Sequence, residues 1–152
     1  MQDDGPRARV LIVDDNVHNI EVLHRTLHRQ GYTEIGSAQG IDHASDLLDT
    51  VDPQVLIVDV DLIIMDGYAF LDRLRCSARW RDLPVLIIVS RQPAATIRTA
   101  TARGATGFIS LPFNALEITY KIEQAVRGVG PRAAEIADLT DPDPATSFGH
   151  QP

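Results

Sequence analysis

The chain has 152 residues, of which 44% are hydrophobic and 23% charged, a composition typical of one soluble globular domain. Its formal charge of −7 argues against a nonspecific nucleic-acid binder, because neutralising phosphates requires a basic surface. No apolar run approaches the roughly 20 residues of a membrane span, and the polar start lacks the apolar stretch of a signal peptide. With Cys76 as the only cysteine, we expect a cytoplasmic protein without internal disulfides or membrane segments.

Apolar runs of strand length alternate with segments of helical spacing along most of the chain. The expected strands, in chain order, are residues 10–13, 33–38, 55–58, 85–89 and 106–109. The expected helices follow them in turn: 17 to a stop at Gly31, 41–51, 67–76, an alanine- and threonine-rich helix ending at Arg103, and 114–126 with Asn114 as its cap. Such alternation with short connections implies right-handed crossovers and a parallel sheet covered on both faces.

The composition changes near the C-terminus. Residues 129–152 are polar and rich in proline, with few bulky apolar side chains. We therefore expect a domain over residues 7–128, followed by a flexible tail or linker that adds little to the core.

Acidic side chains follow the first and third expected strands. In an open α/β sheet, ligands bind beyond the carboxyl ends of the strands. Those ends present Asp14, Asp15, Asp59 and Asp61, with the hydroxyl of Ser90 after the fourth strand. Each Asp alone is explained by turn or cap preference. Together they repel, by about 3 kcal/mol per pair at ~5 Å and an effective dielectric of about 20, unless a cation is bound. A hard divalent ion such as Mg²⁺ suits this oxygen-rich rim.

Four motifs occur in a characteristic order. They are VLIVDDN at 10–16, VLIVDVDLIIMDG at 55–67, LPVLIIVS at 83–90 and GATGFISLPF at 104–113. In this order and spacing they resemble the response-regulator receiver domain of two-component signalling, across about residues 8–128. The resemblance implies a flavodoxin-like α/β fold, with a five-stranded parallel sheet in the order 2-1-3-4-5 and five helices on both faces.

The resemblance also implies roles for the rim residues. Asp59 corresponds to the phosphoacceptor, and Asp14 and Asp15 to the acidic pair that holds Mg²⁺. Asp61 corresponds to a metal ligand through its backbone carbonyl, and Ser90 to the hydroxyl that contacts the phosphoryl group.

One position departs from the family pattern. Leu111 stands where the family has a lysine that pairs with phosphoryl oxygens, so we expect weaker switching. Arg91 is a candidate substitute cation, whereas Lys121 in the last expected helix is not expected to substitute. Phe108 falls where the family keeps an aromatic switch. The family also implies a cis peptide bond between Leu111 and Pro112.

The implied partners are a sensor histidine kinase or phosphotransfer protein, and a downstream protein or an output domain absent from these residues. A homodimer is a further option; direct contact with nucleic acid or membrane is not expected.

Two other functions stay open at this point. A degenerate receiver could act as a phosphorylation-independent interaction module, as Leu111 suggests. The DxD pattern of Asp59 and Asp61 also resembles haloacid-dehalogenase-type phosphohydrolases, although Ile63 departs from that signature. His24 and His28, four residues apart, could bind a metal, but without a third ligand a solvated helix face is the simpler interpretation.

Overall fold

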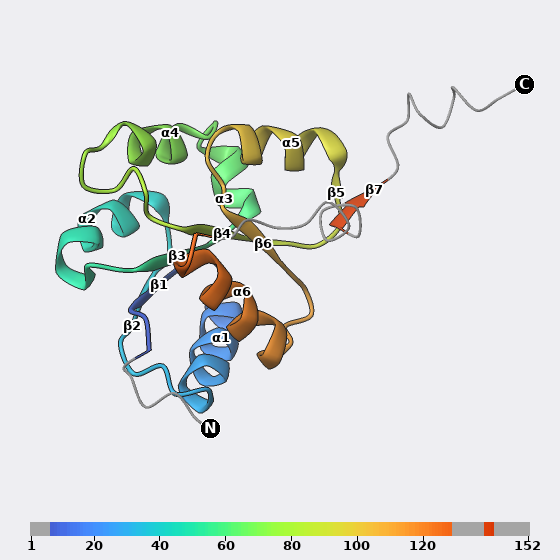
Figure 1. Cartoon of the computed structure of the whole chain (residues 1–152). Helices are drawn as coiled ribbons and strands as arrows, with labels where there is room; N and C mark the ends of the chain where they lie inside the picture. Colours follow the sequence, from blue (N-terminus) through green and yellow to red (C-terminus); the bar gives the residue numbers. More distant parts are fainter. Residues whose placement is uncertain (1–6, 129–138, 142–152) are drawn as a thin grey trace, which may run out of the picture.

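The structure is a computed structural model that describes residues 7–128 and 139–141 (Figure 1). Its strands are β1 (Val10–Val13), β2 (Ile35–Ala38), β3 (Val55–Asp59), β4 (Val85–Val89), β5 (Gln92–Pro93), β6 (Gly107–Ser110) and β7 (Thr140–Asp141). Its helices are α1 (Val17–Arg29), α2 (Ile41–Val51), α3 (Val60–Met65), α4 (Ala69–Cys76), α5 (Ala94–Ala102) and α6 (Ala115–Val126).

The main sheet has five parallel strands in the order β2-β1-β3-β4-β6. Since β6 is the fifth strand of this sheet along the chain, the predicted order 2-1-3-4-5 is confirmed. Continuous apolar runs form its centre because both faces are covered, and all four residues of β1 are completely buried.

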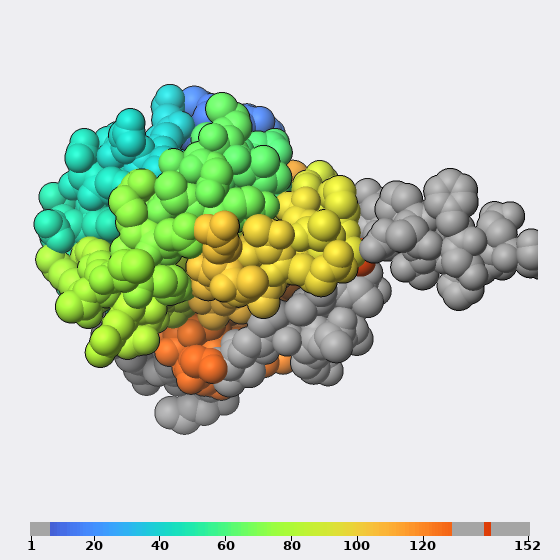
Figure 2. Space-filling model, turned by 90° about the horizontal axis from the view of Figure 1, so that it is seen from above, coloured from blue at the N-terminus to red at the C-terminus, as the bar shows by residue number. Residues whose placement is uncertain are grey.

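Helices cover the two faces of the sheet unequally. Helices α1 and α6 lie on one face, and α2 to α5 lie on the other (Figure 1); Figure 2 shows α2, α4 and α5 side by side from above. Alternation along β1 divides the core, because Ile12 packs with Leu27 and Ile122 whereas Leu11 joins the cluster that holds Leu48. The carboxyl ends of the strands stay uncovered by these layers.

A short helix that the sequence did not suggest follows β3. Asp59 caps α3 by accepting a hydrogen bond from the backbone N–H of Asp61, at 3.0 Å between N and Oδ2. Leu62 and Ile63 of this helix are buried. The five expected helices are therefore joined by a sixth among the described residues, because local capping and burial turn an expected loop into a helical turn. The predicted cis bond between Leu111 and Pro112 is also confirmed.

In the part of the chain that the structure describes, no helix combines the length and apolar character needed to cross a membrane.

The second sheet lies outside the predicted architecture. Strand β7 pairs in parallel with β5, with Thr140 opposite Gln92. Leu139, just before β7, is 7% exposed and joins the apolar cluster that includes Ile97 of α5. Leu139 thus packs on the main core, although it stands in the segment whose composition predicts a tail. The other tail positions, 129–138 and 142–152, lie outside the described residues.

Arg75 in α4 joins three loop carbonyls. Its guanidinium donates to the carbonyls of Gly104, at 3.1 and 2.6 Å, Trp80, at 3.3 Å, and Arg81, at 3.1 Å. We expect Arg75→Met to lower the free energy of unfolding by about 1 to 3 kcal/mol, because these acceptors lose a charged donor. Urea unfolding measures the change, with Arg98→Met on α5 as the matched exposed control; equal effects of both variants would contradict this role.

Candidate functional site

A pocket of about 250 Å³ opens at the carboxyl ends of the central strands. Its walls come from the segments that follow β1, β3, β4 and β6. The lining residues are Asp14, Asp15, Asn16, Asn19, Asp59, Val60, Asp61, Ser90, Gln92 and Leu111. The parallel sheet thus brings together residues that are almost a hundred positions apart in the sequence.

Asp14 is the buried acid of this pocket, with 1% of its surface exposed. Burial raises the pKa of its carboxyl above the ordinary value, and two hydrogen bonds oppose this shift. The backbone N–H of Asn16 donates to Oδ1 at 2.9 Å, and the side-chain amide of Asn19 donates to Oδ2 at 3.1 Å. Asn16 also caps α1, so the first helix and the acidic pocket share one turn.

Asp59 ends β3 and is partly buried. Burial first, and then the negative charges of Asp14 and Asp61, together raise the pKa of its carboxyl to about 6, against the hydrogen bond from the Asp61 N–H. Ionisation of this carboxyl is therefore costly in the pocket, and a bound cation would reduce that cost.

Three carboxylates converge closely enough to share a cation. Carboxylate oxygens of Asp14, Asp15 and Asp59 lie within 4.8 Å of one another. A hard divalent cation with oxygen ligands fits this donor set and would offset the mutual repulsion. Nitrogen or sulfur ligands do not contribute to this group, so softer transition metals are poorly matched.

Ser90 and Leu111 line the pocket from the ends of β4 and β6, with Leu111 39% exposed. Arg91, the sequence-derived candidate cation, is not among the lining residues. Its Nη2 instead donates a hydrogen bond to the backbone carbonyl of Thr140, at 2.8 Å. The structure thus brings the apolar leucine to the acids and directs the arginine toward β7.

Phe108 and Lys121 lie away from the pocket lining. Phe108 is 1% exposed within the core cluster on the α2 to α5 face. Nζ of Lys121 donates to the Phe108 carbonyl at 2.6 Å and lies 3.7 Å from the carboxylate of Glu117. The single lysine is thereby held between α6 and β6.

The sequence analysis missed three polar residues of the pocket, Asn16, Asn19 and Gln92. Asn19 had a recognisable signal, because it stands three positions after the Asn16 cap and so lies on the same side of the first turn of α1. Gln92 had none, because a glutamine in a loop carries no pattern that distinguishes it from other surface residues.

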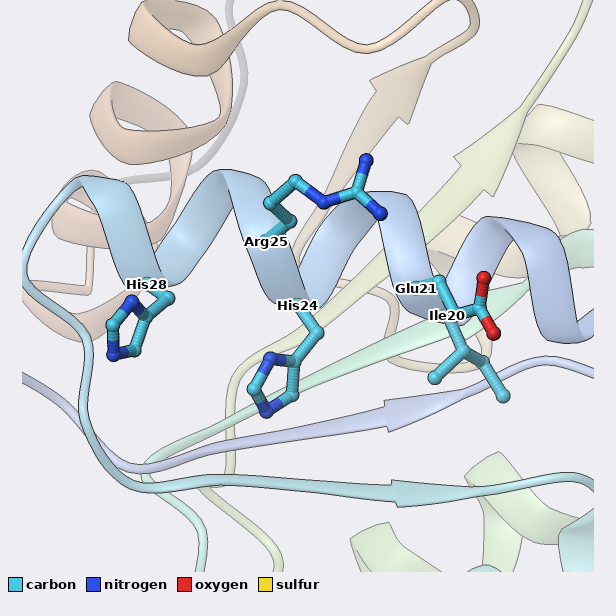
Figure 3. Close-up of a pocket in the computed structure, with 5 residues that line it drawn as sticks. All are labelled: Ile20, Glu21, His24, Arg25 and His28. Atoms are coloured by element: carbon cyan, nitrogen blue, oxygen red, sulfur yellow. The ribbon is translucent and has the colours of Figure 1, made fainter.

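A second hollow, of about 520 Å³, lies on α1 (Figure 3). Figure 3 shows His24 and His28 projecting from the same side of the helix, with Arg25 directed away from them. Among the described residues, however, the only group of three convergent metal-ligand side chains is the aspartate cluster. The histidine pair is therefore not part of a three-ligand metal centre.

The model of the response regulator receiver domain family matches residues 10–123. The chain belongs to the response regulator receiver domain family. This receiver is 29% identical over 129 residues to the chemotaxis protein CheY homolog of Campylobacter jejuni subsp. jejuni, covering 84% of this chain and 99% of that protein.

Solved structures agree with this assignment. The chemotaxis response regulator CheY4 of Vibrio cholerae superposes with a TM-score of 0.69 at 26% identity, over 78% of this chain and 98% of that one. The receiver domain of NtrX from Brucella abortus gives a TM-score of 0.68 at 29% identity, with the same coverages of 78% and 98%. The receiver fold and its signalling function are thus shown, and the phosphohydrolase hypothesis is set aside.

Proposed function

We propose that this receiver takes up a phosphoryl group on Asp59 in a Mg²⁺-dependent reaction. The observation that carries the proposal is the convergence of Asp14, Asp15 and Asp59 within 4.8 Å at the carboxyl ends of β1 and β3. Such a cluster of negative charges is unfavourable without a cation. The carboxylate of Asp59 belongs to the cluster and lines the open pocket.

The side chains of Asp14, Asp15 and Asp59 and the backbone carbonyl of Asp61 would hold the ion. Bound there, Mg²⁺ supplies positive charge that offsets the carboxylates and the incoming phosphoryl group. A carboxylate oxygen of Asp59 attacks phosphorus while the bond from phosphorus to the donor's leaving group breaks. The hydroxyl of Ser90, which also lines the pocket, donates a hydrogen bond to a phosphoryl oxygen.

We further propose that Leu111 replaces the lysine of the family and weakens the switch. Its side chain lines the pocket but offers no hydrogen bond, so the phosphoryl group loses a charged donor. Phe108 stays the proposed switch aromatic, because it is buried in β6 directly before the segment that carries Leu111.

A receiver implies a partner histidine kinase. We propose that such a kinase or a phosphotransfer protein is the donor, in the cytoplasm, and that a downstream protein or a separate output domain reads the switch. Residues 7–128 form the proposed receiver unit; dimerisation is a further proposal.

Incubation with acetyl phosphate and Mg²⁺ tests the proposal. Intact-mass measurement is expected to show addition of one phosphoryl group, and trapping of the acyl phosphate followed by peptide mapping should place it on Asp59. Omission of Mg²⁺ is the control and should prevent the addition. Modification of another residue, or none at all, would contradict the assignment.

A second candidate function is supported by Leu111 alone. An apolar side chain beside three carboxylates suits a receiver that binds its partner without phosphorylation. This alternative expects no phosphoryl uptake in the same assay, with Mg²⁺ either present or absent.

A further inference from the structure

A third hollow, of about 190 Å³, lies at the end of the sheet opposite the acidic pocket. Its walls come from the segment before β1, the loop between α1 and β2, and the C-terminal end of α6. Parallel strands all begin at one end of a sheet, so these walls stand where β1 and β2 begin. The helices α1 and α6 cover this same face of the sheet (Figure 1).

Two arginines of this hollow face one carboxylate. Nη1 of Arg7 lies 2.6 Å from Oε1 of Glu123, whereas Nη2 of Arg127 lies 3.9 Å from Oε2 of the same carboxylate. The longer separation exceeds hydrogen-bond distance, so the Arg127 guanidinium keeps N–H donors that can turn to a ligand. Two guanidinium groups and one carboxylate give the lining residues a charge of +1, in a chain of −7. The hollow therefore suits an anion.

The rest of the lining is largely apolar. Tyr32 is 1% exposed, and the Arg7 guanidinium lies 5.4 Å from the centroid of its ring. Burial raises the pKa of the Tyr32 hydroxyl above the ordinary value of 10.0, so the phenol adds no negative charge at neutral pH. Ile122 and Val126 of α6 also line the hollow. A ligand is thus offered both positive charge and apolar surface.

We propose that this hollow binds a small carboxylic acid with an apolar body. The carboxylate of the ligand accepts hydrogen bonds from Arg127 and Arg7. Its apolar part packs against Tyr32, Ile122 and Val126. A cavity of roughly 150 Å³ holds a molecule of benzene, so this hollow has room for a ring or a short branched chain that bears a carboxylate. The proposal does not depend on phosphoryl acceptance at Asp59.

Glu123 competes with the ligand for the arginines. Its carboxylate already accepts a hydrogen bond from Arg7, and the carboxyl end of α6 adds a partial negative charge, so the ligand depends on both arginines. Glu123→Gln keeps the length of the side chain and an acceptor oxygen but removes the repelling charge. We expect this variant to bind the ligand about fivefold more tightly, the effect of one exposed charge pair.

Titration of the full chain with benzoate, followed by amide chemical shifts, tests the proposal. Benzoate is expected to cause saturable shifts at Tyr32 and in the last turn of α6. Benzamide has the same ring without the charge and should bind about tenfold more weakly, because it forms no charged hydrogen bonds. Inorganic phosphate has the charge without the apolar body and should also bind more weakly than benzoate.

Arginine variants test the assigned contacts. Arg127→Met should weaken benzoate binding by about tenfold, and its side chain is 73% exposed, so the fold does not depend on it. Arg7→Met should weaken binding similarly; because Arg7 also contacts Glu123 and Tyr32, its folding is checked by urea unfolding. Arg98→Met, at an exposed position of α5, is the matched control and should bind benzoate like the wild type.

Several results would overturn the proposal. Equal binding of benzoate and benzamide would remove the role of the charge, and equal binding of benzoate and inorganic phosphate would remove the role of the apolar lining. The absence of saturable shifts, shifts confined to the acidic pocket, or binding by Arg127→Met as tight as that of the wild type would overturn the site itself. Each of these results leaves phosphoryl acceptance at Asp59 untouched.

Discussion

Without metal, the protein is expected to lose stability as the pH rises through about 6, the raised pKa of Asp59. The unfolded carboxyl has a pKa near 3.8, so between these two values the folded state binds more protons than the unfolded state. The stabilising contribution is complete below about 3.8 and is lost as the pH passes about 6. We expect a loss of about 1 to 2 kcal/mol, after a discount for solvent screening of a partly exposed carboxyl.

Mg²⁺ is expected to remove this loss. Binding to the native state alone stabilises it by about 2.7 kcal/mol at a hundredfold excess over the dissociation constant. The effect should be largest above the pKa of Asp59, where its carboxylate is ionised. Urea unfolding in chelator and in excess Mg²⁺, at pH values below and above the pKa of Asp59, measures the loss of stability and its removal by Mg²⁺.

Asp59→Asn isolates the contribution of this carboxyl. Asparagine is also a good helix N-cap, so the hydrogen bond from the N–H of Asp61 can persist. The variant should be more stable than the wild type in chelator at neutral pH, depend less on pH, and respond less to Mg²⁺. Asp46→Asn, on the exposed side of α2, is the matched control. Equal pH profiles for wild type and Asp59→Asn would rule out a raised pKa at Asp59.

Leu111→Lys is expected to strengthen the phosphorylated state by roughly 10- to 100-fold, because a charged hydrogen bond contributes about 1.5 to 3 kcal/mol. Leu111 already lines the pocket and is 39% exposed, so a longer polar side chain can reach solvent or the acids without entering the core. The measurement is the fraction of phosphoprotein at fixed acetyl phosphate and Mg²⁺, together with its half-life.

Two controls define this experiment. Leu116→Lys introduces the same charge at an exposed position of α6 and should leave phosphorylation unchanged. Arg91→Ala tests the substitute cation and should lower phosphoprotein in the wild-type background, but less where Lys occupies position 111. If all of these variants match the wild type, position 111 is neutral for phosphoryl chemistry and Arg91 does not replace the lysine.

Short-range patterns in the sequence predicted the strands that form the core of this receiver. The runs at 10–13, 55–58 and 85–89 form central strands because continuous apolar segments bounded by polar residues must be buried on both faces. Asp14 and Asp59 follow two of these strands, and parallel strands bring their carboxyl ends to one edge. The strand order and the cis bond at Pro112 came from resemblance to a family and are confirmed by the structure.

The tertiary structure alone decided which distant residues meet. Arg91 and Thr140 are 49 positions apart, and no periodicity links them. Leu139 stands in a polar, proline-rich segment, so composition indicated a tail, yet its side chain reaches the α5 side of the core. Composition averages over a segment, whereas burial depends on where one side chain meets an apolar surface. The acids of the pocket could therefore be predicted from the sequence, whereas the hydrogen bond between Arg91 and Thr140 could not.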